Sequence, residues 1–145
     1  MLNLTDLLSE LKQPELSNSK IGNLEIYQYD CALIENRVTV NSDKCTCGLF
    51  KISSHGIDGW AEYKLPEVQH FDLIHWASVF MPLRGLSIYE GMIYIQNKNE
   101  PWGPIRKTLV ESALMNLSTN LQNPSNSMSL ERSHLFTRSQ AYFSF

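Results

Sequence analysis

Two cysteines separated by a single residue, Cys45 and Cys47, could together ligate a metal ion. A zinc site needs a second pair of ligands at a defined spacing, and that pair is missing here. In a strand, residues two apart point to the same face, where two thiols would also suit a small apolar patch. We favour this packing role. With Cys31 the chain has three cysteines, and an odd count favours reduced thiols in the cytoplasm over a disulfide framework.

A second possible chemistry involves a grouping of histidine, aspartate and serine. His70 and His75 flank Asp72, and Ser78 follows, so a base, an orienting acid and a nucleophile could be drawn. A nucleophile turn and an oxyanion site are missing, which favours surface and core-edge histidines. Glu62 could serve as an acid, but a carboxylate at a strand end is more often solvated or paired. We therefore assign no catalytic, cofactor-binding or metal-binding residue.

The composition is that of an ordinary globular domain. The chain has 145 residues, of which 43% are hydrophobic and 19% charged, so it suits one domain with enough apolar material for a core. The formal net charge is −3 without a cluster of Lys and Arg, so we expect no nucleic-acid partner. No apolar run approaches the roughly 20 residues that span a bilayer, and a signal-peptide pattern is missing. We expect a cytoplasmic protein without membrane contact.

The first predicted element is an amphipathic helix at 3–12, followed by a polar linker at 14–23. The helix carries an apolar stripe at helical spacing, formed by Leu4, Leu7, Leu8 and Leu11. The stripe has two interpretations: it covers part of the domain's own apolar surface, or it binds a partner.

Three strands are predicted next, at 24–34, 45–53 and 57–63, from their aromatic and β-branched residues. The last two are separated by a tight turn, in which Gly56 suits a positive backbone angle. So short a turn makes them antiparallel neighbours.

Helical periodicity begins after Pro66. Ser87 and Glu90 have the spacing of a capping box and should open a helix. A longer helix should start at Ile105, with Lys107 and Glu111 on its solvent side. Its sheet-facing residues should be Leu109, Ala113, Leu117 and Leu121.

The end of the chain, 140–145, alternates as a strand does. The whole pattern predicts an α+β fold: a three-stranded antiparallel meander followed by a helical bundle, with an extra N-terminal helix and a C-terminal strand.

This order, and several sequence segments, resemble the N-terminal capping domain of the mandelate racemase/muconate-lactonizing branch of the enolase superfamily. The segment 47–63 is similar to the family's second strand, tight turn and third strand, except that Ala61 stands where the family has a second glycine. The segments 82–95 and 102–117 resemble the passage into the second helix and the long helix that ends the domain. The segment 117–130 is similar to the family's segment that leads to the barrel. The segment 139–145 resembles the first barrel strand.

The resemblance begins at about Gly22 and implies a capping-like domain at 22–130 and a tail at 131–145 that is similar to the first barrel strand. The helix and linker predicted at 1–21 have no counterpart in the family. In that family, carboxylates of a barrel hold Mg²⁺, and a Lys or His of the same barrel is the base. A barrel of this type takes about 250 residues and would begin only at the tail. The resemblance therefore transfers no catalytic residue, metal ligand or cofactor, and we expect no enzyme activity.

The sequence thus predicts a non-enzymatic protein-interaction or regulatory module that binds a protein partner or forms a homo-oligomer. We expect the tail strand to lack a pairing neighbour and so to offer an open edge to a second copy; the alternative is that it folds back on its own domain. The alternative function is the capping subunit of a split Mg²⁺-dependent racemase, epimerase or cycloisomerase with its barrel on another chain, or a truncated remnant of such an enzyme. The candidate interaction surface comprises the leucine stripe (Leu4, Leu7, Leu8, Leu11) and the tail aromatics Tyr142, Phe143 and Phe145.

Overall fold

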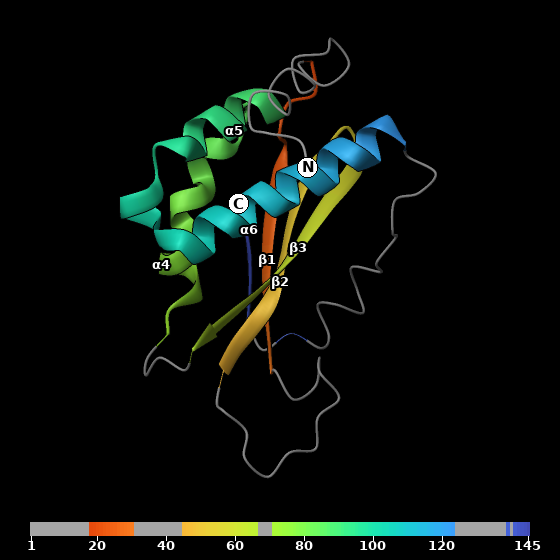
Figure 1. Cartoon of the computed structure of the whole chain (residues 1–145). Helices are drawn as coiled ribbons and strands as arrows, with labels where there is room; N and C mark the ends of the chain where they lie inside the picture. Colours follow the sequence, from red (N-terminus) through yellow and green to blue (C-terminus); the bar gives the residue numbers. More distant parts are fainter. Residues whose placement is uncertain (1–17, 31–44, 67–70, 124–138, 140) are drawn as a thin grey trace.

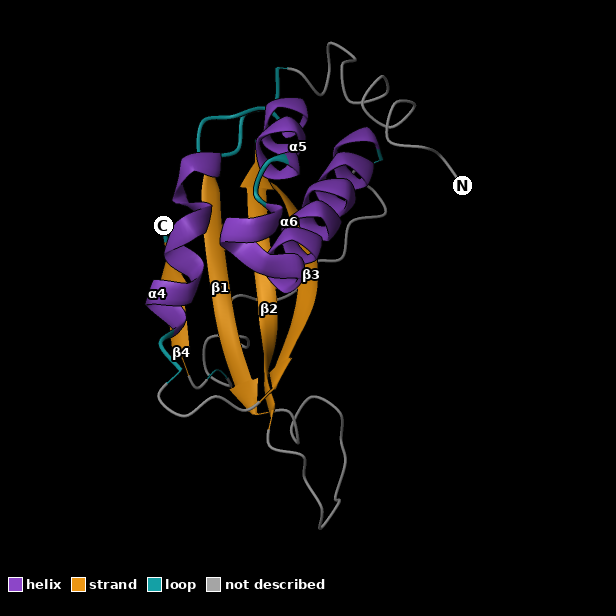
Figure 2. Ribbon diagram, turned by 60° about the vertical axis from the view of Figure 1, so that its left-hand side comes forward, coloured by secondary structure: helices purple, strands orange, loops and turns teal. Residues whose placement is uncertain are grey.

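The protein folds as a four-stranded antiparallel sheet with helices on one face (Figures 1 and 2). This architecture confirms the predicted α+β fold class. The computed structural model describes residues 18–30, 45–66, 71–123, 139 and 141–145. The predicted helix at 3–12 lies outside them, and with it Leu4, Leu7, Leu8 and Leu11 of the candidate interaction surface.

The predicted strands are present as β1 (Asn23–Asp30), β2 (Cys45–Ser54) and β3 (Ile57–Pro66). Together with β4 (Ala141–Ser144) they form one sheet in the order β3-β2-β1-β4, and every neighbouring pair is antiparallel. β3 continues past its predicted end at Tyr63 because Leu65 is also buried in the core.

The turn between β2 and β3 has the predicted form. Ser54 and Ile57 are cross-strand partners, so two residues make the turn, His55 and Gly56. Their φ angles are 52° and 76°, both positive. Two positive angles are the signature of the type I′ turn, whose twist matches the twist of the strands on either side.

The expectation that the tail strand lacks a pairing neighbour is wrong. β4 pairs with β1, with Tyr142 opposite Tyr27, and Phe145 exchanges two backbone hydrogen bonds with Leu24, of 2.9 and 3.0 Å. Phe145 itself is 8% exposed and belongs to the core. The tail has thus folded back on its own domain, because β1 supplies the backbone partners and the helical layer covers the aromatic side chain.

The helices follow the signals in the sequence. A helical run begins with α4 (Leu73–Ala77) and continues as the 3₁₀ helix η1 (Ser78–Leu83). At the start of α5 (Ile88–Gln96), Ser87 and Glu90 form the predicted capping box, with hydrogen bonds of 3.0 and 3.1 Å. The last helix is α6 (Asn99–Gln122), which is kinked at Gly103, where φ is 77°.

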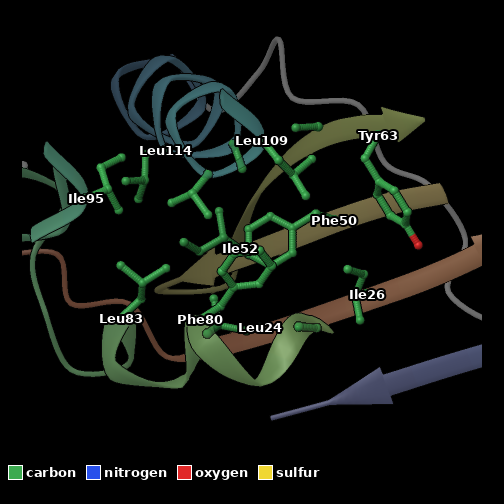
Figure 3. Close-up of a cluster of buried hydrophobic side chains, with 14 of the residues drawn as sticks. Leu24, Ile26, Phe50, Ile52, Tyr63, Phe80, Leu83, Ile95, Leu109 and Leu114 are labelled. Atoms are coloured by element: carbon green, nitrogen blue, oxygen red, sulfur yellow. The ribbon is translucent and has the colours of Figure 1, made fainter. Parts of the chain in front are cut away.

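The core lies between the sheet and these helices (Figure 3). Phe50 of β2 stands at its centre, 5.1 Å from the ring of Phe80 between ring centroids. α6 packs closely on β3 at Gly59. A Cβ atom added to this glycine would lie 2.6 Å from Leu117 Cβ, so a larger residue would not fit between strand and helix. Leu109, Ala113 and Leu117 are buried as predicted, while Leu121 is partly buried against the core.

Lys107 and Glu111 are the residues predicted for the solvent side of α6. They form a pair across one helical turn, with 3.8 Å between Nζ and Oε1, and both side chains are partly exposed.

Two asparagines of α6 also hold the outer edge of β3. The backbone N–H of Trp60 donates to Asn116 Oδ1 at 2.9 Å, and Asn120 Nδ2 donates to the carbonyl of Asp58 at 2.8 Å. The two amides are joined to each other by a bond of 3.2 Å. Side chains of α6 therefore satisfy backbone groups at this end of the strand. On most edge strands the outward-facing N–H and C=O groups have no protein partner.

The polar linker predicted at 14–23 is, in its described part, attached to the domain. The N–H of Ile21 donates to Leu86 O, its carbonyl accepts from Gly85 N, and its side chain is in the core. Among residues 18–23 the isoleucine is the one large apolar residue, and burying it fixes the path of the chain into β1. Within the described residues, no helix is both long and apolar enough to cross a membrane.

Candidate functional site

The sheet face opposite the helices carries a cluster of charged and aromatic side chains. Side chains alternate along a strand, so Leu24 and Ile26 of β1 enter the core while Glu25 and Tyr27 point to the other face. We call the five residues of this face the tyrosine–carboxylate cluster: Glu25, Tyr27, Lys51, Trp60 and Tyr142.

The register of the strands places these residues side by side. Glu25, Lys51 and Trp60 are successive cross-strand partners on β1, β2 and β3. Tyr27 and Tyr142 are partners on β1 and β4, and their ring centroids are 4.9 Å apart. The cluster therefore involves all four strands.

The carboxylate of Glu25 is the centre of the cluster and is 2% exposed. Lys51 Nζ lies 3.2 Å from Oε2, which also accepts the Tyr27 hydroxyl at 3.0 Å, and the Tyr142 hydroxyl donates to Oε1 at 3.0 Å. Burial raises the pKa of Glu25, but the charge of Lys51 and the two hydroxyls together hold that pKa below its usual value. The carboxylate is thus ionised, paired and closed to solvent.

Lys51 has further contacts that fix its position. Its Nζ lies 5.5 Å from the centre of the Trp60 ring and 3.8 Å from Asp58 Oδ2. The indole Nε1 of Trp60 is buried and has no acceptor within the described structure. A paired carboxylate among packed rings has no room for a substrate, so the cluster joins β4 to the sheet and leaves no open catalytic group.

Two further tyrosines are buried in the sheet: Tyr29 beside this cluster and Tyr63 on the opposite face, in the core under the helices. Burial raises the pKa of Tyr29 to about 12 and also raises the pKa of Tyr63. The hydroxyl of Tyr63 donates to the carbonyl of Tyr27 at 2.8 Å.

We expect the domain to lose stability in strongly alkaline solution because of Tyr29. An unfolded tyrosine ionises near pH 10, whereas the folded one keeps its proton to about pH 12, so its contribution is complete below pH 10 and is lost as the pH rises through about 12. Urea unfolding between pH 8 and 11.5 measures this loss. Tyr29→Phe should show a shallower decline than the unmodified chain, and equal declines would contradict the assignment.

A groove lies at the β4 edge of the sheet, next to the start of α4. Its volume is about 370 Å³. We call it the α4–β4 groove. It is the second candidate site because it is accessible to solvent, whereas the carboxylate of the tyrosine–carboxylate cluster is not.

The histidine, aspartate and serine grouping makes capping contacts and no triad. Asp72 Oδ1 accepts the backbone N–H of His75 at 3.1 Å, and Ser78 Oγ donates to the backbone carbonyl of the same residue at 2.8 Å. Neither side chain is bound to the imidazole in these contacts. His70 lies outside the described residues, and Glu62 is exposed on β3.

Of the two cysteines Cys45 and Cys47, the structure describes the side chain of Cys47. Cys47 is buried, and its thiol donates to the carbonyl of Tyr29 at 3.7 Å, which fits the packing role. The side chain of Cys45 is outside the description, as is Cys31. Among the described side chains, no group of three His, Cys, Asp or Glu could hold a metal ion.

The tail aromatics of the candidate interaction surface contact their own domain. Phe145 is in the core, Phe143 packs against it, and Tyr142 belongs to the tyrosine–carboxylate cluster. Phe145 is therefore not an exposed contact residue, which corrects that part of the predicted surface.

Comparison with known proteins gives one distant similarity. The solved structure of a protein from Pseudovibrio sp., described as a mandelate racemase/muconate lactonizing enzyme, is similar over 77% of this chain at 16% sequence identity and a TM-score of 0.42. This chain spans 31% of that structure. No protein-family model and no curated protein matches the chain. Membership of the enolase superfamily accordingly stays a prediction from the sequence.

Proposed function

We propose that this domain is a non-enzymatic protein-interaction module with the fold of an enolase-superfamily capping domain. Two local features support the fold relationship. The type I′ turn at His55 and Gly56 and the capping box of Ser87 and Glu90 both lie where the resembled family has its tight turn and its second helix.

One observation carries the interaction role. Ile74 and Met81 lie on the helical run of α4 and η1, and their side chains are 54% and 50% exposed. They are seven residues apart, which is about two helical turns, so they share one side of the run. The opposite side is in the core, through Leu73, Ala77, Phe80 and Leu83.

The partner that we propose is a second copy of this chain. A two-fold axis through this surface would bring each exposed side chain against the same surface of the other copy, which is how most homodimers are built. Large apolar side chains that remain half-exposed on the free domain lose their contact with water in such an interface.

The expected result is a dimer at high micromolar concentration, measured by light scattering after size-exclusion chromatography. Ile74→Glu and Met81→Glu should each shift the protein towards the monomer, because two-fold symmetry places the new charge twice in the interface. The matched control is Ile93→Glu on α5, which alters an apolar side chain of 40% exposure on another helix.

Circular dichroism should show unchanged helix content for all three variants, since all three positions are exposed. A chain that stays monomeric at every concentration, and retains no protein partner in extracts of its native host, would disprove the interaction role. If the chain dimerises and neither variant weakens the dimer, the interface lies on another surface.

A further inference from the structure

The α4–β4 groove has a size suited to a ligand. Its volume of about 370 Å³ is within the range of pockets that hold small organic molecules. Residues that line it come from β1, from β4 and from the start of α4: Gln28, Phe71, Asp72, Leu73, Ile74 and Ala141.

One small residue, Ala141 of β4, contributes to the open end of the groove. Ala141, Gln28 and Gly48 are successive cross-strand partners of β4, β1 and β2. Over Gly48 the space is taken by the Tyr63 ring, whose hydroxyl would collide with a Cβ atom there. Ala141 has only a methyl group, so at its end of the row the side chains leave space above the sheet.

Gln28 places an amide beside the apolar lining residues Leu73 and Ala141. Leu24 and Ile26, which precede it on the same face of β1, are fully buried core residues, whereas Gln28 is half-buried. Within the described structure its side-chain amide makes no hydrogen bond. It therefore offers a carbonyl acceptor and an amino donor to the groove.

Asp72 adds a carboxylate that has no cation nearby. Glu25, Asp58, Glu90 and Glu111 each have a lysine Nζ within 4.0 Å, and among the described residues Asp72 has none. Within the described part of the chain its carboxylate accepts one hydrogen bond, from the backbone N–H of His75 to Oδ1, which leaves Oδ2 for another donor.

We infer that the α4–β4 groove binds a small organic molecule with a primary ammonium group on an apolar stem. The ammonium group has three N–H donors and a positive charge, which match the Asp72 carboxylate and the Gln28 carbonyl. The stem lies against Phe71, Leu73 and Ile74. Ile74 lines the groove and also belongs to the proposed dimer surface, so a second copy and the ligand would compete for this side chain.

The probe for this site is 2-phenylethylammonium, titrated into the full chain at pH 7 with two-dimensional NMR as the readout. Saturable shifts should be confined to the amides of Gln28, residues 71–74 and residues 141–142. The neutral compound 2-phenylethanol has the same ring and chain length, and it should bind several-fold more weakly because it cannot pair with the carboxylate.

Two variants separate the charge from the shape of the groove. Asp72→Asn removes the charge and keeps an N-cap residue of similar quality, so α4 should persist while affinity falls about three- to fivefold, as for an exposed ion pair. Ala141→Leu fills the low end of the groove and should abolish the saturable shifts.

Glu62→Gln is the control, because it removes an exposed carboxylate on β3, away from the groove. It should leave the affinity unchanged. If Glu62→Gln and Asp72→Asn weaken binding equally, attraction to the net negative charge explains the shifts and the site is refuted. Equal binding of the amine and the alcohol, or an Ala141→Leu variant with intact spectrum and unchanged shifts, would also refute it.

Discussion

Replacing Lys51 with methionine should lower the free energy of unfolding by about 3–5 kcal/mol, the usual range for breaking a buried ion pair on one side. The substitution keeps the apolar stem and removes the charge that lies 3.2 Å from Glu25. The side chain of Lys51 is 14% exposed and that of Glu25 is 2% exposed, so water cannot replace the lost cation. Urea unfolding followed by circular dichroism measures the change.

The double variant Glu25→Gln with Lys51→Met distinguishes this cause from a simple loss of packing. It removes both charges, so it should recover a large part of the lost stability. A matched control is Lys107→Met, which breaks the more exposed pair with Glu111 and should cost no more than about 1 kcal/mol. If Lys51→Met cost as little as this control, or if the double variant were no better than the single one, Glu25 would not depend on Lys51.

The pH dependence of the Lys51→Met protein is a second readout of the same cause. In the unmodified chain the pKa of Glu25 is lowered, so its contribution is present above the unfolded pKa and is lost as the pH falls. Without Lys51, burial is no longer opposed by a neighbouring charge, and the neutral acid is favoured. The stability gap between the two proteins should therefore narrow on acidification towards pH 4.

Leu117→Ala should lower the free energy of unfolding by about 2–5 kcal/mol, the range for a truncated core leucine. Leu117 is fully buried and lies where α6 approaches Gly59 on β3. The helix is held at this distance by the glycine, so it cannot move inwards to fill the cavity. Leu121→Ala, one helical turn later and partly buried, should cost less, and Ile105→Ala, at 40% exposure, should cost least. A loss below about half a kcal/mol for Leu117→Ala would mean that another face of α6 meets the sheet.

The sequence was sufficient to predict features that depend on neighbouring residues. The turn at His55 and Gly56 follows from local backbone preference, and the capping box of Ser87 and Glu90 from two side chains three residues apart. The buried stripe of α6 follows from helical spacing alone.

The tyrosine–carboxylate cluster could not be predicted in the same way. The turn at 55–56 fixes Lys51 opposite Trp60, but Glu25 is joined to β2 through residues 31–44, a connection too long for a turn type to set the register. A shift of one residue would turn Glu25 to the other face. The alternation of Glu25, Tyr27 and Tyr29 was the available clue, because it gives β1 a polar and aromatic second face.

The pairing of β4 was missed for a related reason. Tyr142 and Glu25 are 117 positions apart, and which strand edge a tail reaches depends on the completed sheet. The α4–β4 groove likewise depends on the completed sheet, because the pairing of β4 with β1 places Ala141 beside Gln28.

The amide pair of Asn116 and Asn120 has a consequence for colloidal behaviour. Strands that end a sheet can template the addition of foreign strands, and this is a common start of fibre growth. Here the N–H of Trp60 and the carbonyl of Asp58 are already bound by α6, so an incoming strand could pair with this end of β3 only by displacing the helix. The resistance of this edge to aggregation is thus coupled to the docking of α6. Conditions that loosen the helix would expose its apolar face and, at the same time, the unpaired backbone groups of β3.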